Sequence, residues 1–174
     1  MQSSGVFYGA YKHITEDEKK VLLIDIICEE ALKTSEIEGE YLSRDSIQSS
    51  IRKHFGLQPA TDNIPPAEQG ISDMMLDVFE NFTTPLDHKT MHAWHRMLMA
   101  NRRDIKNTGG YRTHSEAMQV VSGYAHKPIV HFEAPPSEVV SEQMKAFLNL
   151  FNATAPNGKN DGHLYTTDDA DANA

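Results

Sequence analysis

The sequence predicts a mainly α-helical protein with one β-hairpin, and two observations support this prediction. Apolar residues recur at helical spacing, most regularly in Ile71, Met74, Met75, Val78, Phe79 and Phe82, a pattern typical of a helix with one buried face. From Ala117 to Phe132 the pattern changes to short β-prone runs on either side of Ser122–Pro128, which predicts two strands joined by a long loop. Because two strands alone are marginal in water, we expect the hairpin to pack against the helices.

The first helix is expected from Thr15 to about Ile37. Thr15 with Glu18 three residues later forms a capping box, which marks a helix start, and Gly39 suits the positive φ often found just past a helix end. Apolar residues occupy more than half of the circumference of this helix. This distribution predicts a central position in a helical bundle.

Four more helices follow in the predicted order. The second starts after Ser43 and ends at Phe55. A proline-containing loop over residues 57–66 separates it from the third, which carries the stripe described above. The fourth follows Pro85, with Asp87 as its cap and Met91, Trp94 and Leu98 directed inward. The fifth opens at Pro135-Pro136-Ser137, and its apolar face comprises Val140, Met144, Phe147, Leu148 and Phe151.

Composition narrows the class of protein. A chain of 174 residues is long enough to bury a core, and a net charge of −9 argues against nonspecific binding to nucleic acid or to anionic membranes. One cysteine, Cys28, excludes a disulfide framework and favours a cytoplasmic setting. No apolar run is long enough to span a bilayer. Residues 161–174 hold four Asp and no Lys or Arg, and we expect a disordered acidic tail there.

A row of histidines, His88, His92 and His95, lies on one face of the fourth predicted helix. Imidazoles one turn apart can bind a metal ion, but no cysteine or His-Glu-x-x-His pattern accompanies them. Histidine rows on helix surfaces are common, so the sequence favours no metal site.

The end of the first helix breaks a physical rule. Acidic residues crowd its C-terminus, where the helix dipole is already negative, and Lys33 is the one cation nearby in sequence. The five acids are Glu29, Glu30, Glu36, Glu38 and Glu40. A local rule broken without local compensation suggests a functional reason.

Several motifs in this order resemble the Fic (Fido-domain) family. Thr34-Ser35-Glu36-Ile37-Glu38-Gly39 fits the family's inhibitory-helix motif, a Ser or Thr, three residues, Glu, then Gly or Asn. Gly109-Gly110-Tyr111-Arg112-Thr113 is followed by the predicted hairpin, then by Pro135-Pro136 and an amphipathic helix, as in the core of the family. The resemblance covers roughly residues 15–160 and is greatest to bacterial Fic proteins with an N-terminal helical region.

The resemblance implies an activity and residue roles. Complete family members transfer AMP from ATP, with Mg²⁺, to protein hydroxyl groups. Thr34, Glu38 and Gly39 would form the regulatory motif, in which Glu38 pairs with an arginine of the catalytic loop. The hairpin would be the flap that docks the target protein through Met118, Val120 and Val121, and Val121, Ser122, Gly123 and Tyr124 would approach the nucleotide.

One departure limits the implied activity. The family motif HPFxDGNGRxxR, which supplies the general base, a Mg²⁺ ligand and the phosphate-binding loop, is absent from the sequence, and His163 has no such loop beside it. We therefore expect a Fic-type helical bundle that is incomplete at its C-terminus, with no catalytic residues, no bound metal and no ATP of its own. The expected parts are residues 1–56 with the inhibitory motif, residues 57–160 as a partial Fic domain, and the tail.

Two alternatives remain open. The chain is a non-catalytic module that pairs with or inhibits an intact Fic partner, or it is a gene remnant whose helices expose faces meant for missing elements and so form homo-oligomers or aggregate.

Overall fold

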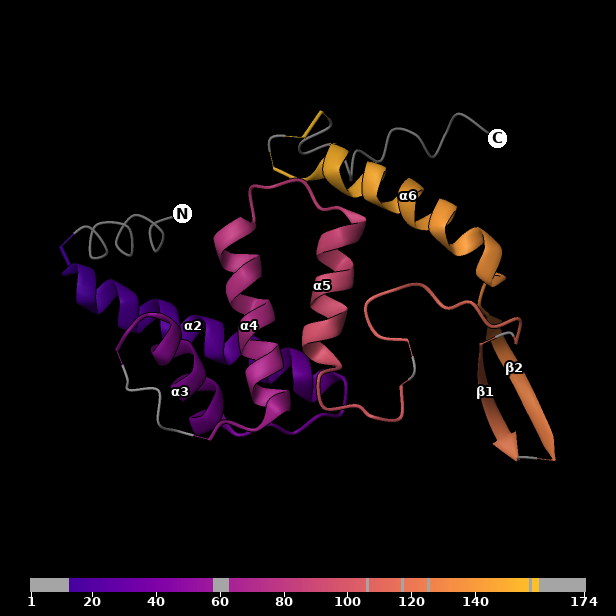
Figure 1. Ribbon diagram of the computed structural model, residues 1–174, viewed down its shortest axis with the longest axis horizontal. Coiled ribbons are helices and arrows are strands. Elements are labelled where there is room, and N and C mark those ends of the chain that lie inside the picture. Colours follow the sequence, from indigo (N-terminus) through magenta and orange to yellow (C-terminus); the bar gives the residue numbers. More distant parts are fainter. Residues whose placement is uncertain are drawn as a thin grey trace, which may run out of the picture. The chain divides into compact units, whose positions relative to one another are not determined.

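The computed structural model of the protein describes residues 13–57, 63–105, 107–116, 118–124, 126–156 and 158–159. Within them the chain forms five helices and one two-stranded antiparallel sheet (Figure 1), so the predicted mainly α-helical class with a hairpin is confirmed. These residues form two compact units. The first contains residues 13–57, 63–82 and 96–105, and the second contains residues 83–95 and the described residues from 107 onward. The domain boundary expected at residue 56 stays a prediction.

The first unit is built on helix α2, Glu16–Ile37. The predicted capping box is present at its start, where the Thr15 N–H donates to Glu18 Oε2 at 2.7 Å and the Glu18 N–H donates to Thr15 Oγ1 at 3.3 Å. Its buried residues form one stripe, comprising Ile24, Ile27, Cys28, Ala31 and Ser35. Val21 and Ile26 are about half exposed, so the apolar surface of this helix is wider than its buried stripe.

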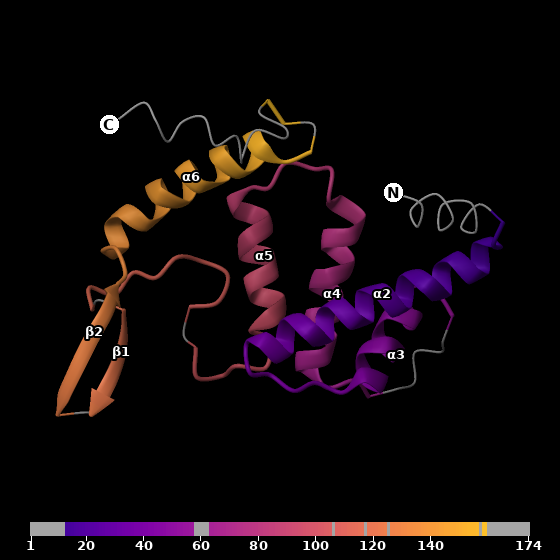
Figure 2. The same ribbon diagram turned by 180° about the vertical axis from the view of Figure 1, so that it is seen from behind.

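Helices α3 (Arg44–His54) and α4 (Pro66–Asn81) pack against α2 and against each other. Figures 1 and 2 both show α2 running across α4 with α3 beside it. The Ser43 hydroxyl caps α3 by accepting from the Ser46 N–H at 3.3 Å. The core of the unit is small and aliphatic, and its buried members are Ile24, Ile27, Cys28, Ala31, Ile47, Ile51, Ile71 and Leu76.

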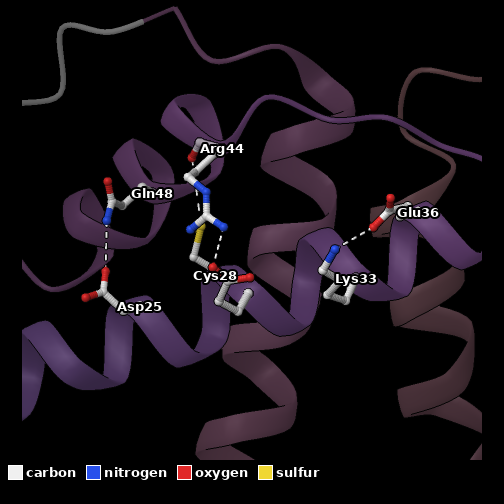
Figure 3. A network of polar contacts seen from close by, with 7 residues as sticks. Asp25, Cys28, Lys33, Glu36, Arg44 and Gln48 are labelled. Carbon is white, nitrogen blue, oxygen red and sulfur yellow. Dashed lines mark hydrogen bonds and ion pairs between the residues drawn. The ribbon is translucent and has the colours of Figure 1, made fainter.

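Polar contacts fasten α3 along the outside of α2 (Figure 3). Gln48 donates to Asp25 at 2.9 Å, and the Arg44 guanidinium pairs with Glu29. The thiol of Cys28 lies 3.8 Å from the Arg44 carbonyl oxygen. Burial raises the pKa of this thiol, which fits the role of apolar filler rather than that of a nucleophile.

Helix α4 departs from its predicted stripe. Ile71 is buried, but Phe79 is 42% and Phe82 is 76% exposed, while Leu76, which is not part of the stripe, is buried. The helix begins at Pro66, inside the loop predicted over residues 57–66, of which residues 58–62 lie outside the described part of the chain. Gly70 allows α4 to approach the backbone at Met97 closely, because a Cβ at residue 70 would lie 2.1 Å from the Met97 carbonyl oxygen.

The second unit contains most of α5 (His88–Leu98), the hairpin and α6 (Ser137–Thr154). Asp87 caps α5 as predicted, since its Oδ1 accepts from the Thr90 N–H at 2.7 Å. Asn152 of α6 holds the segment before α5 by two hydrogen bonds to Leu86, one to the N–H at 2.8 Å and one to the carbonyl at 2.7 Å. On the predicted apolar face of α6 only Leu148 is buried, while Phe147 and Phe151 are nearly half exposed.

The hairpin consists of β1, Gln119–Tyr124, and β2, Lys127–Glu133. Its strands are longer than predicted, because Ser122, Gly123 and Tyr124 pair with Ile129, Pro128 and Lys127, where a long loop was expected. A bulge between Val120 and Val121 shifts the register. Every residue of both strands is exposed, so the expectation that the hairpin packs against helices is wrong for the described residues.

In the described part of the chain, no helix is both long enough and apolar enough to cross a bilayer. The acidic tail expected over residues 161–174, and His163 within it, lie outside the described residues.

Candidate functional site

The sequence motif at the end of α2 folds as a hydrogen-bonded helix stop. The Gly39 N–H donates to the Glu36 carbonyl at 3.0 Å, and the Glu40 N–H donates to the Ser35 carbonyl at 2.9 Å. This pair of bonds is the Schellman arrangement, which needs a left-handed residue just past the helix. Gly39 supplies it with a φ of 81°. Thr34 is exposed on the last turn, and its carbonyl accepts from the Glu38 N–H at 3.4 Å.

Glu38 is the C-cap residue of α2, and its side chain is exposed. Its carboxylate has no hydrogen bond or ion pair with any described residue. Two of the neighbouring acids, in contrast, are compensated, because Lys33 pairs with Glu36 at 2.7 Å and Arg44 pairs with Glu29 (Figure 3). The cation Arg44 comes from α3, so the sequence alone did not place it there. Glu38 keeps an unneutralised charge at the negative end of the helix dipole.

A pocket of about 430 Å³ opens beside Glu38, within the first unit. Its lining combines the end of α2 and the segment after it with α4 and residues 98–102. Half of the lining residues are apolar, namely Leu42, Ala67, Ile71, Met74, Leu98 and Met99. The polar lining comprises Thr34, Ser35, Glu38, Glu40, Asn101 and Arg102.

Glu68 fixes one wall of this pocket. It is 8% exposed, and its Oε1 accepts from the Ser43 N–H at 3.2 Å. The bond ties the first turn of α4 to the chain just after Leu42, which lines the pocket. Sequence reasoning missed Glu68, because a single glutamate in the first turn of a helix is ordinary.

Arg102 is held by Asp104 at the edge of the pocket. Its Nε donates to Oδ1 at 2.9 Å and its Nη2 to Oδ2 at 2.7 Å. This bidentate pair lowers the pKa of Asp104 from 3.8 to about 2. Asp104 is the main cause that raises the pKa of Arg102, and the charge of Glu40 is a smaller one.

The Arg102–Asp104 pair predicts an acid titration. A depressed carboxyl pKa contributes stability that is present above the unfolded value and is lost as the pH falls through the folded value. NMR of the Asp104 side-chain carboxyl carbon should therefore show a midpoint near 2. In Arg102→Gln the midpoint should move up towards the ordinary 3.8, while Arg103→Gln serves as the control and should leave it unchanged. An unshifted midpoint in Arg102→Gln would contradict the pairing.

The predicted docking residues of the hairpin, Met118, Val120 and Val121, are all more than half exposed. Val120 pairs with Phe132 and Val121 with Val130, and the described sheet has only these two strands. The outer edge of each strand therefore offers backbone N–H and C=O groups that no described strand satisfies.

The residues predicted to approach a nucleotide, 121–124, are the last four residues of β1. The Ser122 hydroxyl hydrogen-bonds His131 Nε2 at 2.6 Å, and the Tyr124 ring stacks on His126 with centroids 5.6 Å apart. Gly123 has a φ of 90° and lies close to the Lys127 carbonyl oxygen. These residues belong to the second unit, whereas Thr34, Glu38 and Gly39 belong to the first.

Two histidines of the row on α5 hydrogen-bond the segment Gly109–Tyr111. The Gly109 N–H donates to His95 Nδ1 at 2.8 Å, and the Tyr111 hydroxyl hydrogen-bonds His88 Nδ1 and packs its ring edge-on against His92. Among the described residues no group of three or more His, Cys, Asp or Glu is placed to hold a metal ion. The row thus anchors the Gly109–Tyr111 segment, and Arg112 continues the anchoring by donating to the Pro135 carbonyl.

A comparison with models of protein families finds a match in the N-terminal part of the chain. The family model of a domain of unknown function, DUF4172, matches residues 1–57, which include α2, the end of α2 with Glu38, and α3. No curated protein matches the chain. The N-terminal third of this protein therefore resembles a domain family to which no function has been assigned.

Proposed function

We propose that this chain is a Fic-type regulatory protein that presents Glu38 to an arginine of a Fic active site and does not itself transfer AMP. The observation that carries the proposal is the carboxylate of Glu38, which stands at a capped helix end without a partner among the described residues. A carboxylate in this position favours a bidentate pair with a guanidinium. An arginine engaged in this way is no longer available to bind phosphate.

The charge of the pocket beside Glu38 disfavours ATP, the nucleotide that the complete family uses with Mg²⁺. The pocket mouth carries Glu38 and Glu40 at the negative end of α2, which repels a triphosphate. Phosphate sites are instead built at helix N-termini or in glycine-rich loops. No AMP-transfer step is therefore assigned to this pocket.

The hairpin supports a second part of the same proposal, the docking of a protein target. Met118, Val120 and Val121 are exposed beside a free strand edge. An extended peptide can add to such an edge through main-chain hydrogen bonds, while its side chains contact the exposed apolar residues.

An inhibition assay tests the role of Glu38. A purified Fic enzyme, with the HPFxDGNGRxxR motif and with its own inhibitory glutamate replaced by glycine, is supplied with ATP labelled at the α-phosphate. Added chain should suppress the labelling of protein, because Glu38 occupies the arginine. Glu38→Gln should remove most of this suppression, while the control Glu36→Gln, at the glutamate that pairs with Lys33, should retain it.

Two results would contradict the proposal. One is equal suppression by the wild-type chain and by Glu38→Gln, which would place the effect elsewhere. The other is labelling of protein by this chain alone, lost in His163→Ala, which would give the chain a transferase activity.

Exposed apolar residues favour one other candidate function, the association of this chain with copies of itself. Phe79 and Phe82 on α4, and Phe147, Leu150 and Phe151 on α6, are all more than 40% exposed. Under this candidate the thermal transition should be broad and should shift with protein concentration. A sharp transition at a constant temperature, with a monomer mass in sedimentation, would exclude it.

A further inference from the structure

We propose that the pocket beside Glu38 binds a small organic cation that carries a primary ammonium group on an apolar body. This ligand class goes beyond the proposed pairing of Glu38 with a protein arginine. The whole pocket lies within the first unit, so it exists in the chain alone.

The apolar part of the ligand is indicated by the lining. Leu42, Ile71 and Leu98 present branched aliphatic side chains, and Met74 and Met99 add thioethers that adapt to irregular shapes. The volume of about 430 Å³ falls within the range of small-molecule sites. Burial of an alkyl or aryl body against these side chains would stabilise the complex.

The acidic residues at the pocket mouth indicate a positively charged head group. Glu38 and Glu40 both line the pocket, and neither has an ion pair with a described residue. Arg102, the one cation in the lining, is hydrogen-bonded to Asp104 and interacts more weakly with the charge of Glu40. The C-terminal end of α2 adds the negative pole of its dipole at the same place. A cation is favoured here and an anion is repelled.

Ser35 adds an available hydroxyl group to the lining of the pocket. It lines the pocket and is 8% exposed, yet its hydroxyl has no hydrogen-bond partner among the described residues. Among the described residues the fully buried side-chain atoms without a partner are Ser50 Oγ and His92 Nε2, so the unpaired Ser35 hydroxyl is accessible from the pocket that it lines. An ammonium group, with three donors, can donate to Ser35 and to the two carboxylates together.

The apolar lining also separates this site from a metal site. A Ca²⁺ or Mg²⁺ ion would need about six or more oxygen ligands, some of them retained waters. Half of this lining is hydrocarbon or thioether, and the pocket has only two carboxylates. An ammonium group with an apolar body fits both halves of the lining.

Three probes with one body and different heads test the proposal. Phenylbutylamine, phenylbutanol and phenylbutyrate are titrated separately into the chain, whose methionine methyl groups carry an NMR label. Met74 and Met99 line the pocket and report binding, whereas Met118 and Met144, in the second unit, serve as internal controls. The amine should shift Met74 and Met99 alone, and it should bind about threefold or more tightly than the alcohol. The carboxylate should bind most weakly.

Matched variants locate the head group. Glu38→Gln and Glu40→Gln should each reduce the preference for the amine over the alcohol, and the double variant should abolish it. Glu36→Gln, whose side chain does not line the pocket, should leave the preference unchanged. All of these positions are exposed, so each variant should keep the melting temperature of the parent chain.

Several outcomes would overturn the proposal. Equal binding of the three probes would make the pocket a nonselective apolar cavity, and tightest binding of the carboxylate would show that Arg102 dominates it. Absence of shifts at Met74 and Met99 would show that it binds none of these molecules. These measurements use no Fic enzyme. Binding of the amine can therefore be observed even if the chain does not inhibit a Fic enzyme, and inhibition can be observed even if the amine does not bind.

Discussion

Replacement of Ile51 by alanine is expected to lower the free energy of unfolding by about 2–5 kcal/mol, the usual range for a large-to-small change in a well-packed core. Ile51 is fully buried, and it packs in the small core of the first unit with Ile24, Ile27 and Ile47. Few other buried side chains are available to fill the space. Because whole domains are stable by only about 5–15 kcal/mol, the loss would be a large part of the total.

Urea denaturation followed by circular dichroism measures this loss. Ile37→Ala is the matched control, since it removes the same atoms from a side chain that is 83% exposed, and it should change stability by less than about 0.5 kcal/mol. If Ile51→Ala does not fold, Ile51→Val should still fold and cost about 0.5–1.5 kcal/mol. Equal effects at Ile37 and Ile51 would contradict the assigned core.

Replacement of Asn152 by leucine is expected to destabilise the second unit by about 1–3 kcal/mol. The Asn152 amide satisfies both backbone groups of Leu86, at 2.8 Å and 2.7 Å, across a sequence separation of 66 residues. Leucine has a similar size but no polar atoms, so the part-buried N–H and C=O of Leu86 would lose their partners. The segment that leads into α5 should then loosen from α6.

Fluorescence of Trp94, the one tryptophan of the chain, follows this change from within the same unit. Asn149→Leu is the control, because Asn149 is exposed on α6 and has no partner among the described residues. Asn152→Asp should be intermediate, since it keeps the acceptor for the Leu86 N–H but places a carboxylate against the Leu86 carbonyl. A cost at Asn149 as large as that at Asn152 would show that the loss is not specific to the Leu86 contacts.

Local signals in the sequence predicted most element boundaries. Thr15 with Glu18 marked the start of α2, Asp87 marked the start of α5, and Gly39 marked the stop at the end of α2. Each of these signals depends on atoms within a few residues of the chain, so periodicity and capping chemistry suffice to read them. The hairpin was located, but its turn was placed too widely, because the glycine and proline taken as loop residues are paired at the end of the strands.

Burial could not be predicted in the same way. The apolar stripe of α4 includes Phe82, which is 76% exposed, and the face predicted for α6 buries only Leu148. Periodicity shows which side chains share a face, but it does not show what covers that face. The prediction that the hairpin leans on helices failed for the same reason.

One part of the candidate site was predicted from the sequence and another part was not. The Thr34–Gly39 motif was found by its pattern and by the unfavourable charge at a helix end. The pocket was not found, because its lining comes from α2, the chain after it, α4 and residues 98–102, which are far apart in the sequence. Glu68 and the Arg102–Asp104 pair were not predicted either, because charged residues at such positions are common in sequences and carry no pattern of their own.

The sequence by itself determined where helices start and stop, which end of α2 is overloaded with acid, and that Gly39 must follow it. Only the tertiary structure decided that Arg44 neutralises Glu29 while Glu38 stays unpaired, and that the unpaired carboxylate stands beside an apolar pocket. The physical reason is the separation along the chain over which each interaction acts. Capping and helix dipoles act within one or two turns of the chain, whereas charge pairing and cavities depend on which distant segments pack together.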